Sequence, residues 1–158
     1  MRALLMALLA ACSSAAPPPV PTTLPSVRVQ TLGGDAGDVR AASAGRPMVI
    51  DFFATWCEPC REGFPRLARL AKDRPEVAVL GVDIGEEAAL VAAFVARVRI
   101  GYAVFVDADL RLADAAGVTR IPAVLVVAAD GTIVWRGSRV DDALEAAVAR
   151  VAGTAVVR

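Results

Sequence analysis

The sequence predicts an α/β fold in which helices flank a mixed central sheet, with a β-hairpin extension at the N-terminal side. Strand-like and helix-like patterns alternate through most of the chain after residue 26. The strand-like runs are short and almost continuously apolar, as expected for strands covered on both faces. The final two strands flank Asp130–Gly131, a strong hairpin signal. The 158 residues show no internal repeat and suit one domain with a short tail.

The first residues indicate an export signal. Arg2 precedes an apolar run, Ala3–Ala11, which is too short to span a bilayer because a spanning helix needs about 20 residues. Leu9–Ser13 resembles a bacterial lipoprotein lipobox. The resemblance implies that residues 1–11 are a signal peptide and that Cys12 is lipidated. An ordinary signal peptide cleaved at the same alanines, or a plain cytosolic N-terminus, is the alternative.

Residues 12–25 indicate a tether. Five prolines stand among small and polar residues in this segment, a composition that favours extended polyproline II structure. At about 3.1 Å per residue it could hold a domain up to roughly 40 Å from a bilayer. We therefore expect a folded domain at residues 26–158, on the extracytoplasmic (periplasmic) side and lipid-anchored to a membrane.

The N-terminal half of the domain contains the first three predicted elements. Val27–Leu32 and Val39–Ala41 predict a β-hairpin, because the residues between them are rich in Gly and Asp. Met48–Ala54 predicts the first central strand. A helix from about Glu58 to Lys72 follows, since apolar residues recur on one face; they are Phe64, Leu67, Leu70 and Ala71.

The middle of the domain repeats the strand–helix pattern. Val77–Val82 predicts a second buried strand. Glu86–Arg99 has apolar residues at helical spacing, and Gly101 is well placed to end that helix. Ala103–Val106 predicts a third strand, and Leu110–Ala116 a short helix.

The C-terminal part predicts a hairpin and a closing helix. Ala123–Ala128 and Thr132–Arg136 form the two strands joined by the Asp-Gly pair. Asp141–Val151 predicts the last helix, with its acidic residues at the favoured N-terminal end.

Composition excludes several function classes. Seventeen basic residues balance seventeen acidic ones, so the chain lacks the basic footprint of a nucleic-acid partner. The sequence contains no histidine, which excludes hydrolytic triads with histidine and histidine-containing metal sites. We expect no nucleic acid, no metal and no cofactor beyond a redox-active disulfide.

The pattern Cys57–Glu58–Pro59–Cys60 predicts a redox-active pair. It places the first sulfur at the N-terminus of a helix, where unpaired N–H groups stabilise a thiolate. Pro59 suits the first helical turn because its missing N–H costs nothing there. One turn brings Cys60 back beside Cys57. We expect Cys57 to attack a substrate disulfide and Cys60 to resolve the mixed disulfide.

Two other interpretations of the cysteine pair compete with redox catalysis. Half of a metal site is one, but a zinc site needs about four ligands and the chain has three cysteines and no histidine. A structural disulfide is the other, but a bridge that closes so short a loop stabilises little.

The segment Phe52–Cys60 resembles the thioredoxin superfamily, most closely the membrane-tethered reductases related to ResA, TlpA and the cytochrome c maturation thioredoxins. The match covers roughly Val27–Val151. It implies the thioredoxin fold, thiol–disulfide oxidoreductase activity and protein thiols or disulfides as substrates. Pro65 stands at the spacing from Cys57 at which this superfamily carries a proline that kinks the helix.

Two acids are candidates for proton transfer. Asp51 interrupts an apolar strand, and burial would raise its pKa toward neutrality; thioredoxin has a buried aspartate there that assists the resolving thiol. The alternative is an Asp that leans out at a sheet edge. Glu86 resembles a ResA-like glutamate close to the cysteines, or it is simply a helix N-terminal acid. ResA-like members commonly lack an acid at the Asp51 position, so having both is a departure.

Substrate contacts are expected around the cysteines. The superfamily places a cis-proline at Pro122, facing them, and the backbone of Ile121 would pair with an extended substrate segment. The alternative is a proline that simply begins a strand. Trp56 would shield the site and contact substrate, or else only pack. Glu58 and Pro59, between the sulfurs, complete the expected substrate-binding set.

The sequence favours a reductant. The negative charge of Glu58 disfavours a Cys57 thiolate. The pair also lacks the histidine that strongly oxidising members of the superfamily often carry between their cysteines. We expect electrons from a membrane thiol transporter and a cytochrome c maturation role, the reduction of apocytochrome cysteines. A disulfide oxidase or isomerase, or a non-catalytic binding module, is the alternative.

Overall fold

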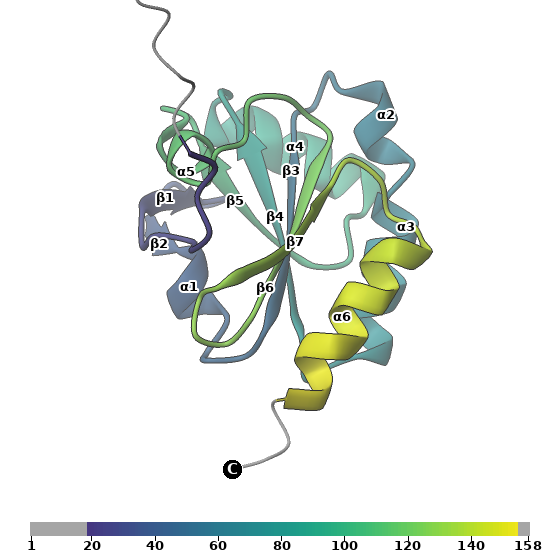
Figure 1. The fold of residues 1–158 in the computed structure, drawn as a ribbon. Helices are drawn as coiled ribbons and strands as arrows, with labels where there is room; N and C mark the ends of the chain where they lie inside the picture. The colour runs from purple at the N-terminus through teal and green to yellow at the C-terminus, as the bar shows by residue number, and fades with distance from the viewer. Residues whose placement is uncertain (1–18, 155–158) are drawn as a thin grey trace, which may run out of the picture.

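The computed structural model describes residues 19–154 and confirms the α/β, thioredoxin-type architecture. The expected signal peptide and the lipidation at Cys12 lie outside the described residues. The elements are β1 Arg28–Thr31, β2 Ala36–Asp38, α1 Val39–Ala42, β3 Met48–Phe53, α2 Glu58–Arg61, α3 Phe64–Asp73, β4 Ala78–Ile84, α4 Ala88–Val98, β5 Ala103–Asp107, α5 Arg111–Ala115, β6 Ala123–Val127, β7 Ile133–Gly137 and α6 Asp142–Thr154. One seven-stranded mixed sheet, in the order β2-β1-β5-β4-β3-β6-β7, has helices on both faces (Figure 1).

The centre of the sheet is formed by β3, all six residues of which are buried. It pairs in parallel with β4 and antiparallel with β6, and β4 pairs in parallel with β5. The carboxyl ends of β3, β4 and β5 therefore meet at one end of the sheet, the place where open α/β sheets usually carry their sites. The loops that follow β3 and β4 lie side by side there.

Two apolar layers cover the sheet. On one face, Val39 of α1 and Leu112 of α5 pack on Ile50 and other β3 residues. On the other face, Leu67 of α3 and Leu144 of α6 pack on the opposite side of β3, next to an aromatic group of Phe53, Phe64 and Phe94 whose ring centroids lie 5.3–6.3 Å apart. Both faces are buried, which explains the continuous apolar runs of the central strands.

The N-terminal hairpin forms, but the prediction of a second strand at Val39–Ala41 is wrong. The second strand is β2, and the residues after it form the short helix α1. The cause is Asp38, whose carboxylate accepts hydrogen bonds from the backbone N–H groups of Arg40 and Ala41 and so caps the helix.

The single helix predicted at residues 58–72 is two helices. Pro65 has no N–H to continue the hydrogen-bond ladder, and α2 ends four residues before it. Gly63 stands in the break, where a Cβ would lie 2.7 Å from Cγ2 of Val140. The helix predicted at Glu86–Arg99 is α4, which ends at Val98; its C-cap is Arg99 in a left-handed conformation (φ 56°), so the helix stops before Gly101.

The packed chain begins before residue 26. The Leu24 side chain is 1% exposed, and its N–H donates to the carbonyl of Gly131. Thr23 forms a bridge with Thr132, beside the β6–β7 hairpin. The end of the segment expected to be a tether is therefore part of the domain. Within residues 19–154, no helix has the length and apolar character needed to cross a membrane.

Candidate functional site

The cysteine pair lies where β3 ends and α2 begins. Cys57 is the N-cap of α2 in an extended conformation, and its N–H donates to the carbonyl of Ala54 at 3.0 Å. Cys57 and Cys60 are joined by a disulfide, with their Cα atoms 5.4 Å apart. The expectation that the two sulfurs lie together is confirmed.

The local sequence accounts for this geometry. The apolar β3 strand fixes the start of the loop inside the core, since Ala54 is fully buried. Pro59 stands in the first turn of α2, where a residue without an N–H is tolerated. Cys57 is the N-cap of α2, the position at which the unpaired N–H groups of a helix's first turn would stabilise a thiolate after reduction.

A cavity of about 500 Å³ opens beside Cys60. It is lined by Pro59, Pro122 and Asp51 as well as Cys60. The Ile121–Pro122 peptide bond is cis, as the resemblance implied. Four of the residues singled out in the sequence therefore share one hollow, although they come from β3, α2 and the start of β6.

Asp51 is buried at the floor of this cavity, with 2% of its surface exposed. Burial raises its pKa to about 7, while a hydrogen bond from the Tyr102 hydroxyl to Oδ2, 3.1 Å long, acts in the opposite direction. An acid with a pKa near neutrality can take or give a proton at working pH. The alternative of an Asp leaning out at a sheet edge is wrong.

Tyr102 was not predicted as part of the site. Tyr102 directly precedes β5. Its side chain passes over Gly81, the residue that pairs with Asp51 in the sheet, and contacts Asp51. A Cβ at Gly81 would lie 3.2 Å from the Tyr102 ring. A glycine in the middle of a buried strand is the signal in the sequence that a side chain or backbone comes close there.

Glu86 does not line the Cys60 cavity. Its carboxylate accepts hydrogen bonds from the N–H of Thr55 at 2.5 Å and from the Thr55 hydroxyl at 2.7 Å. Arg61 of α2 donates to the carbonyl of Thr55 at 2.8 Å. Glu86 therefore holds the loop that leads into Cys57, and Asp51 is the acid on the side of Cys60.

Asp83 is a second buried acid that was not predicted as part of the site. It is 0% exposed, and neither of its carboxylate oxygens has a hydrogen-bond partner among the described residues. Burial, followed by the effect of the nearby Glu86 carboxylate, raises its pKa to about 8. The signal in the sequence was an acid between Val82 and Ile84, in the same kind of apolar setting as Asp51.

The surface around Cys57 is exposed and partly apolar. The Trp56 side chain is 70% exposed, so it is not part of the buried core. Glu58 is also exposed, on the first turn of α2. The disulfide itself is mostly covered, with Cys57 4% and Cys60 3% exposed.

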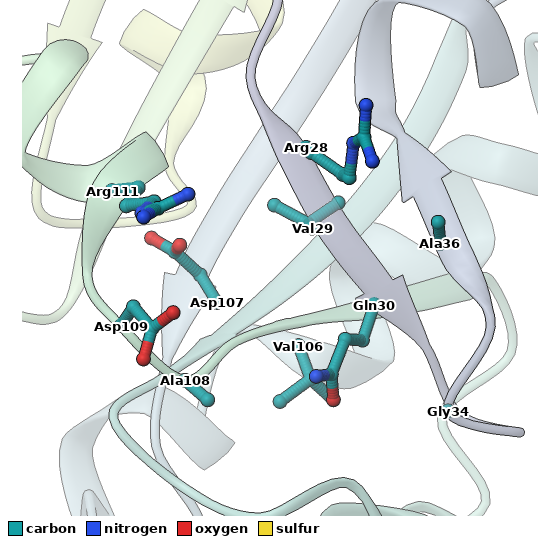
Figure 2. Close-up of a pocket in the computed structure, with 10 residues that line it drawn as sticks. All are labelled: Arg28, Val29, Gln30, Gly34, Ala36, Val106, Asp107, Ala108, Asp109 and Arg111. Atoms are coloured by element: carbon teal, nitrogen blue, oxygen red, sulfur yellow. The ribbon is translucent and has the colours of Figure 1, made fainter.

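A separate pocket of about 230 Å³ lies between β1 and the loop after β5 (Figure 2). Figure 2 shows the Asp107 carboxylate on the side of Arg111, whereas the Arg28 side chain on β1 points away from Asp107 and Asp109. The Asp107 carboxylate accepts hydrogen bonds from N–H groups at the start of α5, at 2.8 and 3.1 Å, so it serves the fold. The pocket contains no cysteine, and residues 19–154 contain no cluster of acids and cysteines suited to a metal ion.

Comparison with known proteins points in one direction. The Redoxin family model matches residues 19–151. Thiol-disulfide oxidoreductase ResA of Bacillus subtilis is 29% identical over 92 residues, which are 57% of this chain and 51% of ResA. Thiol:disulfide interchange protein CycY of Rhizobium leguminosarum bv. viciae is 32% identical over 97 residues, 61% of this chain and 52% of CycY. The chain thus spans about half the length of these two relatives.

Solved structures match more of the chain. A secreted Mycobacterium tuberculosis disulfide oxidoreductase homologous to E. coli DsbE is 26% identical, with a TM-score of 0.67 over 79% of this chain and 96% of its own. A thiol:disulfide interchange protein of the thioredoxin family from Chlorobium tepidum is 27% identical, with a TM-score of 0.69 over 84% and 97% of the two chains.

Proposed function

We propose that this chain, which belongs to the Redoxin family, is a thiol–disulfide oxidoreductase that acts on protein disulfides through Cys57 and Cys60. One observation carries the proposal. The disulfide lies at the N-terminus of α2, and one of its cysteines lines a cavity together with Pro122 and the buried Asp51. The names of the relatives support the same class of reaction.

The reaction begins from the reduced pair. The Cys57 thiolate attacks a substrate disulfide, forms a mixed disulfide and releases one substrate thiolate. Cys60 then loses its proton, attacks the sulfur of Cys57 and releases the second substrate thiolate. The substrate disulfide is reduced by two electrons, and the two cysteines are oxidised to the observed disulfide.

Asp51 is the proposed acceptor of the Cys60 proton. Both groups line the same cavity, which is large enough for water to connect them. With a pKa of about 7, Asp51 is ionised in a large fraction of molecules at neutral pH and can still give the proton up again. The burial that makes the acid costly in the fold is what gives it this pKa.

A reducing direction is proposed from the charge next to Cys57. Glu58 is exposed on the first turn of α2, and its carboxylate opposes the thiolate that the helix terminus favours. A less stable thiolate makes the dithiol a better reductant. The reduction potential tests this, because a potential near that of the strong oxidant DsbA, about −120 mV, would contradict it.

We also propose a cellular setting. Lipidation at Cys12 would hold the domain on the extracytoplasmic side of a membrane, with a membrane thiol transporter as electron donor. The proposed role is the reduction of apocytochrome c cysteines before haem attachment. Support comes from the lipobox-like Leu9–Ser13 segment and from the secreted M. tuberculosis neighbour.

A trapping experiment tests the reaction and identifies its substrates. Cys60→Ala removes the resolving thiol, so substrates should accumulate as mixed disulfides with Cys57 that a reductant releases. Cys57→Ser with Cys60→Ala is the matched control and should trap nothing. Equal capture by both variants, or no loss of insulin reduction in Cys57→Ser, would contradict the proposal.

A further inference from the structure

The Pro122 loop, residues 117–122, runs from the end of α5 to β6 and borders the reaction site. Pro122 lines the cavity beside Cys60. No hydrogen bond joins the backbone of Thr119, Arg120 or Ile121 to another residue of the described chain. Their N–H and C=O groups can therefore pair with an extended peptide. They do nothing to fix the loop itself, so its position depends on what packs against it.

We propose that the N-terminal segment, residues 21–24, holds the Pro122 loop in the position at which it binds substrate, with Arg136 and Pro21 as the positioning residues. This inference rests on the proposed function, in which a protein disulfide is the substrate. It gives the packed end of the expected tether a part in recognition as well as in the fold.

Arg136 joins the N-terminal segment to the Pro122 loop. It lies on β7 opposite Leu125, so its side chain is on the face of the sheet that α1 and α5 cover. One guanidinium N–H donates to the carbonyl of Ala116, directly before the loop, at 2.6 Å, and another donates to the carbonyl of Pro21. A single planar group thus fixes the start of the loop and the start of the segment relative to each other.

Pro21 also lies directly against the loop. A Cβ at Gly117 would be 2.7 Å from Cδ and 3.4 Å from Cγ of Pro21. The contact is possible because Gly117 has no side chain, so the proline ring covers the backbone where the loop begins. Figure 1 shows the start of the described chain, in dark purple, passing beside α5.

Leu24 and Ile121 extend the contact toward the cysteines. The Leu24 side chain belongs to the same buried cluster as Val118 of the loop. Ile121 packs against this cluster and also against the cluster that contains Cys57 and Cys60. The apolar path from the N-terminal segment to the reaction site therefore runs through the side chains of the Pro122 loop.

The N-terminal segment can support the loop because it is itself tied to the sheet. The N–H of Leu24 donates to the carbonyl of Gly131 at 2.9 Å, and the N–H of Ile133 donates to the carbonyl of Thr22 at 2.8 Å. These two bonds pair the segment with the β6–β7 hairpin. A loop held on a fixed support is ordered before the substrate arrives, so binding costs less conformational entropy.

Two arginine variants separate this role from a general loss of stability. Arg136→Met removes both hydrogen bonds of the guanidinium and keeps an apolar side chain. Arg40→Met is the matched control. The Arg40 guanidinium also donates to two backbone carbonyls, those of Leu24 and Asp130, but to no residue of the loop.

Two glycine variants test the segment without touching β7. Pro21→Gly removes the ring that covers Gly117. Val20→Gly is the matched control, since it adds the same backbone freedom at a neighbouring side chain that is exposed.

NMR of the oxidised proteins tests whether the loop is held. The ¹H–¹⁵N NOE of the Thr119, Arg120 and Ile121 amides should fall in Arg136→Met and in Pro21→Gly, because the loop gains motion on the ps–ns timescale. Both control variants should keep the values of the parent.

Kinetics test whether the held loop binds substrate. Every protein carries Cys12→Ser, so the active-site pair supplies the only thiols. In single-turnover reduction of excess insulin, the half-saturating insulin concentration should rise roughly tenfold in Arg136→Met and about threefold in Pro21→Gly, with the limiting rate unchanged. The rate with 2,2′-dithiodipyridine, a small disulfide that has no peptide to pair with the loop, should stay at the parent value in all variants.

Several outcomes would overturn the inference. Unchanged NOE values in Arg136→Met and Pro21→Gly would show that the segment does not hold the loop. An unchanged half-saturating concentration would show that the order of the loop does not serve binding. An equal rise in Arg40→Met would assign the effect to lost stability, and a parallel fall in the dithiodipyridine rate would assign it to the sulfurs.

Failure of the proposed function gives a different result. A parent protein that reduces dithiodipyridine but not insulin would contradict the assignment of protein disulfides as substrates. The NMR comparison needs no catalysis, so it still decides whether the N-terminal segment holds the Pro122 loop.

Discussion

Asp51 and Asp83 occupy comparable positions on neighbouring strands, but they meet different surroundings. Asp51 accepts a hydrogen bond from Tyr102 and borders a cavity next to Cys60, whereas Asp83 is sealed among apolar groups and adjoins Glu86. Both pKa values are raised first of all by burial. Asp51, unlike Asp83, therefore lines the cavity in which a proton could be exchanged with Cys60.

Asp51→Asn should change how stability depends on pH. The pKa of Asp51 is about 7 in the fold against an ordinary 3.8, so between these values the folded protein holds a proton that the unfolded chain has lost. The free energy of unfolding then falls as pH rises through that window. Urea unfolding of the oxidised proteins should show the variant more stable at pH 8 by up to about 4 kcal/mol.

At pH 4 the same two proteins should differ by less than about 1 kcal/mol, because Asp51 is then protonated in the fold and already partly protonated in the unfolded chain. A stability difference that is the same at both pH values would contradict the raised pKa. Asp83 contributes a slope of the same sign in both proteins, so it cancels in the comparison.

Tyr102→Phe should raise the pKa of Asp51 further. The Tyr102 hydroxyl favours the charged carboxylate, and its hydrogen bond is the influence that lowers this pKa. ¹³C NMR of the Asp51 carboxyl in the oxidised proteins should place the variant's midpoint above that of the parent. An unchanged or lower midpoint would show that the 3.1 Å contact carries no such effect.

At the level of elements, the break between α2 and α3 allows the loop before α6 to approach the active-site helix. Gly63 in the break has an ordinary helical conformation (φ −78°), so a side chain there is excluded by space. The Cβ of an alanine would lie 2.7 Å from the Val140 side chain.

Gly63→Ala should therefore lower the free energy of unfolding by about 1–3 kcal/mol, the usual cost of overpacking. Val140→Ala combined with it should recover part of that loss, since it removes the clashing methyl groups. Denaturant unfolding of the two single variants and the double variant gives the coupling. Strictly additive losses would show that the two residues do not clash.

At the scale of the whole molecule, the domain includes residues 21–24, which the proline-rich composition of residues 12–25 had predicted to be part of a tether. Leu24 belongs to the same core cluster as Ile50 and Leu112. Arg136 of β7 donates to the carbonyl of Pro21, and Ile133 donates to that of Thr22. The N-terminal segment thus closes the edge of the sheet beside the β6–β7 hairpin.

Leu24→Ala should cost about 2–5 kcal/mol of unfolding free energy, as for other fully buried leucines. Val20→Ala, at a side chain that is 64% exposed, is the control and should change stability by less than about 0.5 kcal/mol. Thermal or urea unfolding distinguishes the two. A small loss in both variants would mean that the segment is not packed in solution.

The sequence predicted the strand–helix order and the cysteine pair because both depend on local patterns: apolar runs, the Asp-Gly turn and the spacing of Cys57 and Cys60. The prediction from sequence was wrong where a single side chain determines the local structure. Asp38 converts an expected strand into a helix by capping it, and Leu24 draws a proline-rich segment into the core. Tyr102 joins the site through a hydrogen bond to Asp51, a residue far from it in sequence, and no local pattern contains that contact.

Because residues 21–24 pack on the domain, the tether available to an anchored enzyme is shorter than residues 12–25. If Cys12 is anchored in the bilayer, residues 13–20 separate it from Pro21, and at about 3.1 Å per residue this segment spans only about 28 Å. The chemistry would then be confined to a thin layer just above the lipid headgroups. Proteins emerging unfolded from the membrane would meet it there at high local concentration, while folded proteins further away would stay beyond its reach.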